Sequence, residues 1–156
     1  MFDSLAEVLL WLFVIFLGIA FGAGIYEERI VVSRWLTSDD SGRHWNASAA
    51  RQDDTGRRFW AFVTTVPLTL LTLANLTAAW RASSPERSWW LAAAILAVGE
   101  RIFTFVYFIP TMVSLMHASD SSESVKKATR WAHLNYLRLA LALAAWLAAL
   151  NTFSLL

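Results

Sequence analysis

The sequence predicts an all-α fold, a bundle of four transmembrane helices formed by a single integral membrane domain of 156 residues. Hydrophobic residues make up 57% of the chain, and the mean hydropathy is +0.47. This is too apolar for a soluble domain of this size and ordinary for a multi-pass membrane protein. Four apolar segments are long enough to cross a bilayer, and basic residues gather in the two longer connections between them.

The expected spans are about 5–32, 59–80, 89–117 and 131–155. A helix rises about 1.5 Å per residue, so each segment can cross an apolar core of about 30 Å. The first span opens with Asp3 and Glu7, whereas a signal peptide opens with positive charge, so we expect it to be retained. Its clean apolar part ends at Ile25, but further apolar residues follow Glu27 and Glu28, so we expect the helix to continue and carry these charges into the bundle.

The first connection, residues 33–58, holds two turn-like strings, Asp39-Asp40-Ser41-Gly42 and Asp53-Asp54-Thr55-Gly56. Between them, residues 43–51 predict a short interfacial helix with Trp45 as its anchor.

The second connection, residues 81–88, is tight and contains Pro85. The third, residues 118–130, is rich in Ser and Asp, and Ser121 or Ser122 is expected to cap a short helix that precedes the fourth span.

Charge predicts the orientation of the bundle. The first connection holds five basic residues and the third holds three, against two in the second connection. By the positive-inside rule, both termini lie on the outer side and the loops at 33–58 and 118–130 face the cytoplasm. We therefore expect a multi-pass protein of the cell inner (cytoplasmic) membrane.

Composition also excludes several kinds of site. The chain has no cysteine, which excludes disulfides, thiolate catalysis, iron-sulfur clusters and cysteine-ligated zinc. It has no Glu-x-x-His motif of the kind that holds dinuclear iron in four-helix bundles, and a haem between His117 and His133 is disfavoured because both lie near the membrane surface. We expect no cofactor and no metal. Nucleic acid is not an expected partner, because no basic stretch is interleaved with exposed aromatic residues.

Glu100 and Arg101, which lie inside the third span, are the residues whose side chains cost most free energy to place in a membrane. Glu100 is within about 5 Å of the middle of that span, where an ionised side chain costs a few kcal/mol, so it marks a candidate functional site. Helical spacing predicts a polar stripe on the face of Glu100, made of Thr104, Tyr107, Thr111 and Ser114. Arg101 lies about 100° away and should point to a neighbouring helix, toward Glu27 or Glu28.

In this orientation the polar residues of all four spans lie in the cytoplasmic half, where they would line one pocket. The candidate catalytic residues are Glu27, Glu100 and Arg138. The candidate substrate contacts are Thr104, Tyr107, Trp131, His133 and Asn135, while Glu28 and Arg101 are the candidate structural ion-pair residues. Trp35 and Trp60 would form a roof over a flat apolar ligand.

Two interpretations of these charges remain open. Three acids, Glu27, Glu28 and Glu100, oppose three bases, Arg29, Arg101 and Arg138. They form either a buried ion-pair network that only fixes the packing of the helices, or a site in which one carboxylate is incompletely paired and acts on a ligand or proton. His133 is likewise either a hydrogen-bonded interfacial anchor or a base.

Four short strings resemble the anthrone-oxygenase-like family of small four-helix membrane proteins. They are Phe21-Gly22-Ala23-Gly24-Ile25-Tyr26-Glu27, Val32-Ser33-Arg34-Trp35, Phe108-Ile109-Pro110, and Trp131 with Asn135 and Arg138. Ser33 departs from the proline expected in many relatives. The resemblance implies a cofactor-independent oxygenase that converts an anthrone, a flat polycyclic phenol, into an anthraquinone with molecular oxygen. In that chemistry Glu27 or Glu100 would be the base, and Arg138, Asn135 or Tyr107 would stabilise the oxyanion.

The sequence thus supports a membrane-embedded oxygenase or binding protein for a small apolar or aromatic molecule, or a lipid, with homo-oligomerisation as a further possibility. The alternative is a non-enzymatic scaffold or partner subunit whose buried ion pairs are structural. Proton or ion transport is a third possibility, disfavoured because no inverted repeat is evident.

Overall fold

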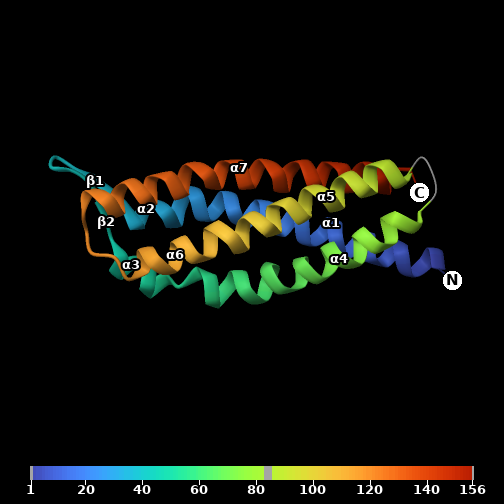
Figure 1. The fold of residues 1–156 in the computed structure, drawn as a ribbon, viewed down its shortest axis with the longest axis horizontal. Helices are drawn as coiled ribbons and strands as arrows, with labels where there is room; N and C mark the ends of the chain where they lie inside the picture. Colours follow the sequence, from blue (N-terminus) through green and yellow to red (C-terminus); the bar gives the residue numbers. More distant parts are fainter. Residues whose placement is uncertain (1, 83–85, 156) are drawn as a thin grey trace.

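A computed structural model describes residues 2–82 and 86–155, and it is 87% helical. Within these residues, four helices are long and apolar enough to cross a membrane, which confirms the predicted four-helix membrane fold: Ser4–Trp35, Gly56–Arg81, Glu86–Met116 and Ser122–Phe153. They lie side by side in an elongated bundle (Figure 1). Both chain ends lie at one end of the bundle, here called the termini end, and the first and third connections lie at the other, the hairpin end.

Each of the first three spans contains a π-helical segment. The first span comprises α1 (Phe2–Tyr26), η1 (Glu27–Val31) and α2 (Val32–Trp35), and so continues past Ile25. The second comprises η2 (Gly56–Thr65) and α4 (Val66–Arg81). The third comprises α5 (Glu86–Phe103), η3 (Thr104–Phe108) and α6 (Ile109–Met116). The fourth is a single helix, α7 (Ser122–Phe153).

Two of these π-helical segments have a proline two residues after their last residue. Pro67 stands in the first turn of α4, after η2, and Pro110 stands in the first turn of α6, after η3. A proline has no N–H to donate, and its ring displaces the carbonyl four residues earlier. The wider π turn, with hydrogen bonds from i to i+5, accommodates that displacement.

At the termini end the bundle is held by small residues and by Asn75, which forms hydrogen bonds with Leu9 and Trp90. Ala93 and Ala97 on α5 are buried in the same core cluster as Ala145 and Ala149 on α7. Such residues let helix backbones approach closely. The second connection includes residues 83–85, and therefore Pro85, which lie outside the described residues.

The first connection differs from the predicted helix over residues 43–51. Strands β1 (Leu36–Asp39) and β2 (Gly42–Trp45) pair antiparallel as a hairpin, and helix α3 (Ala47–Asp53) follows. The prediction was therefore wrong for 43–45. Gly42 has φ +128, a conformation that favours glycine and fits the predicted turn at this point.

Trp45 is not an interfacial anchor. Only 4% of it is exposed, and its indole N–H donates a hydrogen bond to the backbone carbonyl of Leu115 at 2.8 Å. Its burial ties the hairpin to the third span.

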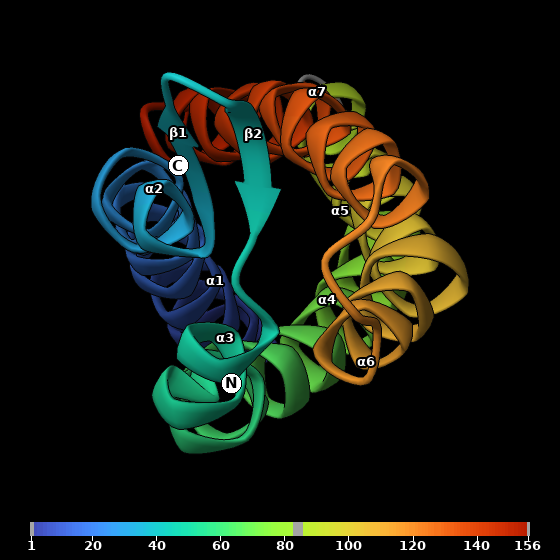
Figure 2. The same ribbon diagram turned by 90° about the vertical axis from the view of Figure 1, so that its left-hand side faces the viewer.

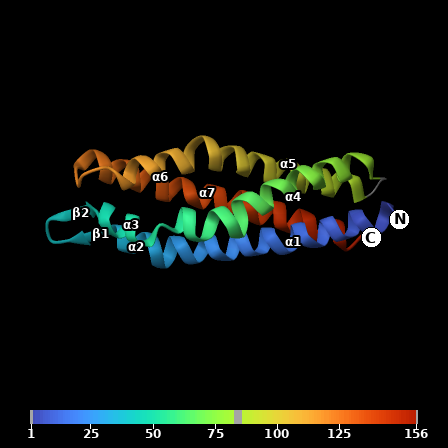
Figure 3. The ribbon, with the colours of Figure 1, turned by 90° about the horizontal axis from the view of Figure 1, so that it is seen from below.

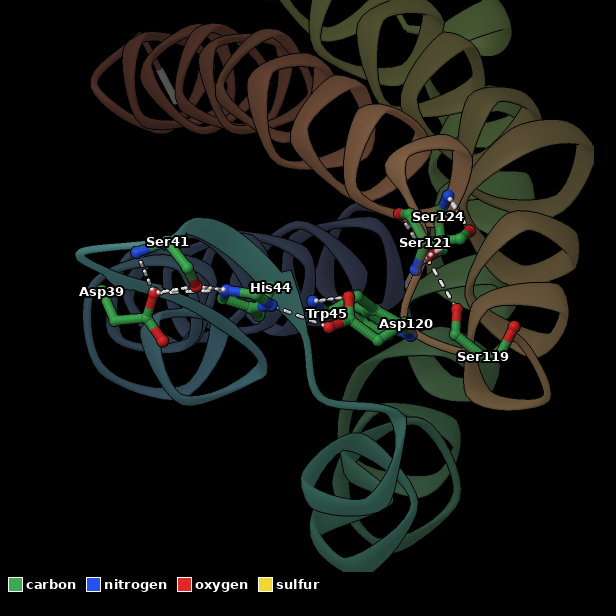
Figure 4. A network of polar contacts seen from close by, with 8 residues as sticks. All are labelled: Asp39, Ser41, His44, Trp45, Ser119, Asp120, Ser121 and Ser124. Atoms are coloured by element: carbon green, nitrogen blue, oxygen red, sulfur yellow. Dashed lines mark hydrogen bonds and ion pairs between the residues drawn. The ribbon is translucent and has the colours of Figure 1, made fainter.

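The third connection fixes the hairpin from the other side, as Figure 4 shows. Asp120 accepts the Trp45 backbone N–H at 2.9 Å and lies 2.8 Å from Nδ1 of His44. The next residue, Ser121, caps α7 by accepting the N–H of Ser124. Because the cap leads straight into the span, α7 begins nine residues before the expected start at 131, and no separate short helix precedes it.

Candidate functional site

A cavity of about 580 Å³ lies in the hairpin half of the bundle and is lined by residues of all four spans. Viewed from the hairpin end, the spans form a ring whose near side is crossed by β2 and α3 (Figure 2). Its lining includes five of the predicted site residues, Glu27, Glu100, Thr104, Trp131 and Arg138, and also Arg101, Trp35 and Trp60.

The third span lines this cavity with a spacing of four residues. Glu100, Thr104 and Phe108 are followed in the lining by Met112 and Met116. A regular helix would have continued from Thr104 to Tyr107, as the predicted stripe assumed. Because η3 holds one more residue per turn, it rotates all later positions and replaces the predicted polar stripe with an apolar one.

Tyr107 and Ser114, which the sequence placed in the polar stripe, lie outside the cavity lining. Tyr107 is outside the lining and stacks on Phe103, with ring centroids 5.7 Å apart. Ser114 is exposed and accepts a hydrogen bond from Nζ of Lys127 at 2.8 Å.

Glu27 presents a carboxylate to the cavity and forms no ion pair with any residue that the structure describes. Its Oε1 accepts hydrogen bonds from Oγ1 of Thr55 at 2.6 Å and from Nε1 of Trp60 at 2.7 Å. Its Oε2 has no hydrogen-bond partner among the described residues, and it is not one of the fully enclosed polar atoms. One oxygen of a side chain that is only 5% exposed is thus free to meet a ligand.

Glu100, by contrast, is fully engaged. Nε of Arg101 donates to its Oε2 at 2.5 Å, and Nη2 of the same guanidinium contacts the same oxygen. Thr104 donates to Oε1 at 3.0 Å, and Nε of Arg138 lies 4.0 Å from that atom. The expected pairing of Arg101 with Glu27 or Glu28 is wrong, because the Arg101 side chain turns back onto Glu100.

Arg138 lies between two aromatic rings. Its Cζ is 4.7 Å from the ring centroid of Phe108 and 5.5 Å from that of Trp60, within the range of cation–π attraction. Only 12% of its side chain is exposed. The rings hold the guanidinium at the cavity wall, where a positive charge can stabilise an oxyanion.

Glu28 and Asn135 form a separate link between the first and fourth spans. Nδ2 of Asn135 donates to Oε2 of Glu28 at 2.7 Å, and neither residue is part of the cavity lining. Of the six charges predicted to lie inside the bundle, Arg29 is exposed, which leaves three carboxylates against Arg101 and Arg138. His133 is also exposed and outside this cavity, and its Nδ1 donates to the Thr129 carbonyl at 2.8 Å.

The lining residues that were not foreseen from the sequence include Thr55, Phe108 and Met112. Thr55 belongs to the predicted turn just before the second span, and this position brings its hydroxyl to Glu27. The signal for Phe108 and Met112 was Pro110, since a proline inside a span points to an altered helical register.

One of three comparisons with known proteins gave a match. The model of a family described as anthrone oxygenase matches residues 56–148, which is more than half of the chain and includes Glu100, Arg138 and the Phe108-Ile109-Pro110 string. The string from Phe21 to Glu27 precedes the matched segment. No match was found among curated proteins or among solved structures. The length of the family match establishes that this membrane-spanning chain belongs to the anthrone oxygenase family.

Proposed function

We propose that the protein is a membrane-embedded oxygenase that oxidises an apolar aromatic substrate of the anthrone type with molecular oxygen and without a cofactor. The observation that carries the proposal is the cavity carboxylate of Glu27, whose Oε2 is unengaged while the other lining carboxylate of the spans, Glu100, is held by arginine. The cavity volume of about 580 Å³ suits a small molecule, because such sites measure roughly 300–1,000 Å³.

Glu27 is the base in the proposed reaction. Its carboxylate takes one proton from the methylene carbon of the anthrone, and the remaining electron pair is shared with the ring carbonyl as an enolate. Electrons pass from that carbon to oxygen, a carbon–oxygen bond forms, and a proton completes a hydroperoxide. Loss of the second methylene hydrogen with cleavage of the O–O bond gives a carbonyl. One anthrone and one O₂ yield one anthraquinone and one water.

The other lining residues have supporting roles. Arg138 places a positive charge where the enolate oxygen would form. The rings of Trp60, Phe108 and Trp131 offer aromatic faces against which a flat substrate can pack. The apolar wall keeps out water that would otherwise return a proton to the carbanion.

The test is turnover of anthrone by the protein in lipid nanodiscs, followed by anthraquinone absorbance and oxygen uptake after subtraction of the uncatalysed rate. Glu27→Gln should lower kcat by at least about 100-fold, the usual contribution of a general base. The matched control is Glu28→Gln, which changes the adjacent buried carboxylate outside the cavity lining and should retain most activity.

Wild-type turnover by Glu27→Gln would contradict the proposal. Equal loss in both variants, with unchanged melting temperatures, would also contradict a specific role for Glu27. A wild-type protein that binds anthrone and never oxidises it would instead be a binding protein.

A further inference from the structure

The wall of the cavity is open on one side, toward the membrane-exposed surface. Among the residues that the structure describes, the exposed lining positions lie at the beginning of η2 and on α6 with its C-cap: Gly56, Arg57, Ile109, Val113 and His117. The lining residues of the first and fourth spans are buried or nearly so, with Leu139 and Ala142 each 7% exposed. The rim of the cavity is therefore the line between the second and third spans.

The path of the second span explains this opening. Figure 3 shows α4 beside α5 near the termini end and leaning toward α1 farther along, and the helix contacts agree. As a result η2 packs against α1, and its contacts with α6 are sparse at most. In the described part of the chain, no hydrogen bond or ion pair joins η2 to α6.

Toward the hairpin end the cavity is covered by β2 and α3, and Gly56, Arg57 and His117 lie exposed at the edge of this cover. Arg51 of α3 donates to the Met116 carbonyl, and Trp45 donates to that of Leu115. Trp35 and Ala50, 1% and 0% exposed, form the wall beneath this cover, and Trp35 donates to Asp53 at 2.8 Å. A molecule arriving along the axis of the bundle would have to break these bonds.

The side opening is apolar along the third span, at Ile109 and Val113, whereas Arg57 and His117 mark its hairpin end. Ile109 and Val113 are 41% and 47% exposed and lie in the third span, within the segment that crosses the membrane. Ala61 and Thr65 face them from η2 as half-buried lining residues. An uncharged aromatic molecule can pass such a rim without losing hydrogen bonds to water, because it has already left water for lipid.

We propose that the cavity takes its ligand from the lipid bilayer, through a lateral opening between η2 and α6, and that the ligand is a neutral aromatic molecule dissolved in the membrane. The nature of the ligand rests on the proposed function; the route rests on the shape of the cavity alone. Val113 is a gate position, because its side chain both lines the cavity and faces outward.

The route can be tested without turnover, because the chain has no cysteine of its own. Ala142→Cys places a single thiol on the α7 wall, opposite the opening. In phosphatidylcholine nanodiscs this thiol should react with apolar N-phenylmaleimide at least about tenfold faster than with a sulfonated maleimide confined to water. Adding Val113→Trp should slow the apolar reagent by about tenfold. The control is Val106→Trp, which makes the same change on the same span at a residue that is 74% exposed and outside the lining. Adding it should not slow the apolar reagent.

Equal reaction with both reagents, no reaction with either, or no effect of Val113→Trp would each overturn the lateral route. Melting temperatures of the three proteins show whether a tryptophan has disturbed the fold. In a turnover assay Val113→Trp should raise KM for anthrone, whereas Val106→Trp should not. If the labelling rates follow these expectations but the protein does not oxidise anthrone, the lateral route stands and the oxygenase function is refuted. If the protein oxidises anthrone but Val113→Trp does not change the labelling rates, the oxygenase function stands and the lateral route is refuted.

Discussion

Two adjacent carboxylates, Glu27 and Glu28, have different surroundings because successive helical residues point about 100° apart. Glu27 faces the cavity and is held by Thr55 and Trp60, whereas Glu28 faces α7 and is held by Asn135. The sequence identified both as buried acids, but it could not assign their partners. Those partners come from residues 28 and 107 positions away, which only the packing of the helices brings near.

Asn75 is a residue whose loss should cost stability and spare the cavity. It is fully buried, donates to the carbonyls of Leu9 and Leu71 at 3.1 and 2.9 Å, and accepts the indole N–H of Trp90 at 2.9 Å. Asn75→Leu would leave that N–H unsatisfied in an apolar core. We expect a loss of about 1–2 kcal/mol in the free energy of unfolding, measured by circular dichroism in mixed detergent micelles.

The control for this change is Thr77→Val, two residues along the same helix. Its hydroxyl is exposed and bonds only the Leu73 carbonyl of its own helix, so stability should hardly change. Equal stability of Asn75→Leu and Thr77→Val would show that the buried asparagine does not tie the three helices together.

At the scale of elements, the bundle has an irregular half and a regular half. The π-helical segments η1, η2 and η3 all contribute to or border the cavity, while α5 and α7 pack through alanines at the other end. Close helix packing at Ala145 and Ala149 follows from the four-residue spacing of these small residues in the sequence. The register of the third span could not be inferred from the sequence, because composition alone does not reveal a π turn. Its local signal was Pro110.

The alanine packing predicts an effect of side-chain size. Ala145 is fully buried between helices, so Ala145→Leu should destabilise the bundle by about 1–3 kcal/mol through overpacking. Ala140→Leu, five residues earlier on the exposed side of α7, should have little effect. Thermal unfolding in detergent gives both values, and similar melting temperatures for the two variants would refute close packing at Ala145.

The hairpin should be attached in a pH-dependent way. The hydrogen bond that His44 donates to Asp120, together with the charge of Asp39, raises the pKa of His44 above its ordinary 6.5. The pKa of Asp120 is lowered from 3.8, first by the Trp45 backbone N–H and then by His44, and that of Asp39 is lowered by Ser41. The His44 contribution is fully present below pH 6.5 and is lost as pH rises through its raised pKa. The aspartate contributions are present above pH 3.8 and are lost as pH falls through their lowered pKa values.

The hairpin should therefore be held most firmly between about pH 4 and 6.5. Hydrogen exchange at the Trp45 amide, corrected for intrinsic exchange, should show less protection at pH 9 than at pH 5.5. His44→Gln should remove this difference, and an unchanged pH dependence in that variant would assign it to other groups.

At the scale of the molecule, the four-span fold could be predicted because hydropathy over 20 or so residues is a strong, local signal. The hairpin could not, since its four-residue strands carry no such signal and its position depends on Asp120, 75 residues from Trp45. The candidate site was predicted in residue type and depth, with Glu27, Glu100, Thr104, Trp131 and Arg138 in the lining. It was not predicted in register, and Tyr107, His133 and Asn135 lie elsewhere.

The orientation of the bundle stays a prediction, and the absence of cysteine makes it easy to measure. An impermeant maleimide added to intact cells should label Ser154→Cys at the termini end. It should label Ser38→Cys, on the hairpin, only after lysis. The opposite pattern would place the hairpin and the loop at 118–130 outside.

The π segment η3 also bears on how such proteins diversify. Removing one residue from 104–108 would restore a regular helix and turn α6 by about 100° around its axis, exchanging Met112 and Met116 for the outward-facing side chains. The same four spans, with the same ends and loops, would then enclose a different wall. Gain or loss of single residues is therefore a means by which relatives of this chain can acquire new ligands while keeping every amino acid that holds the bundle together.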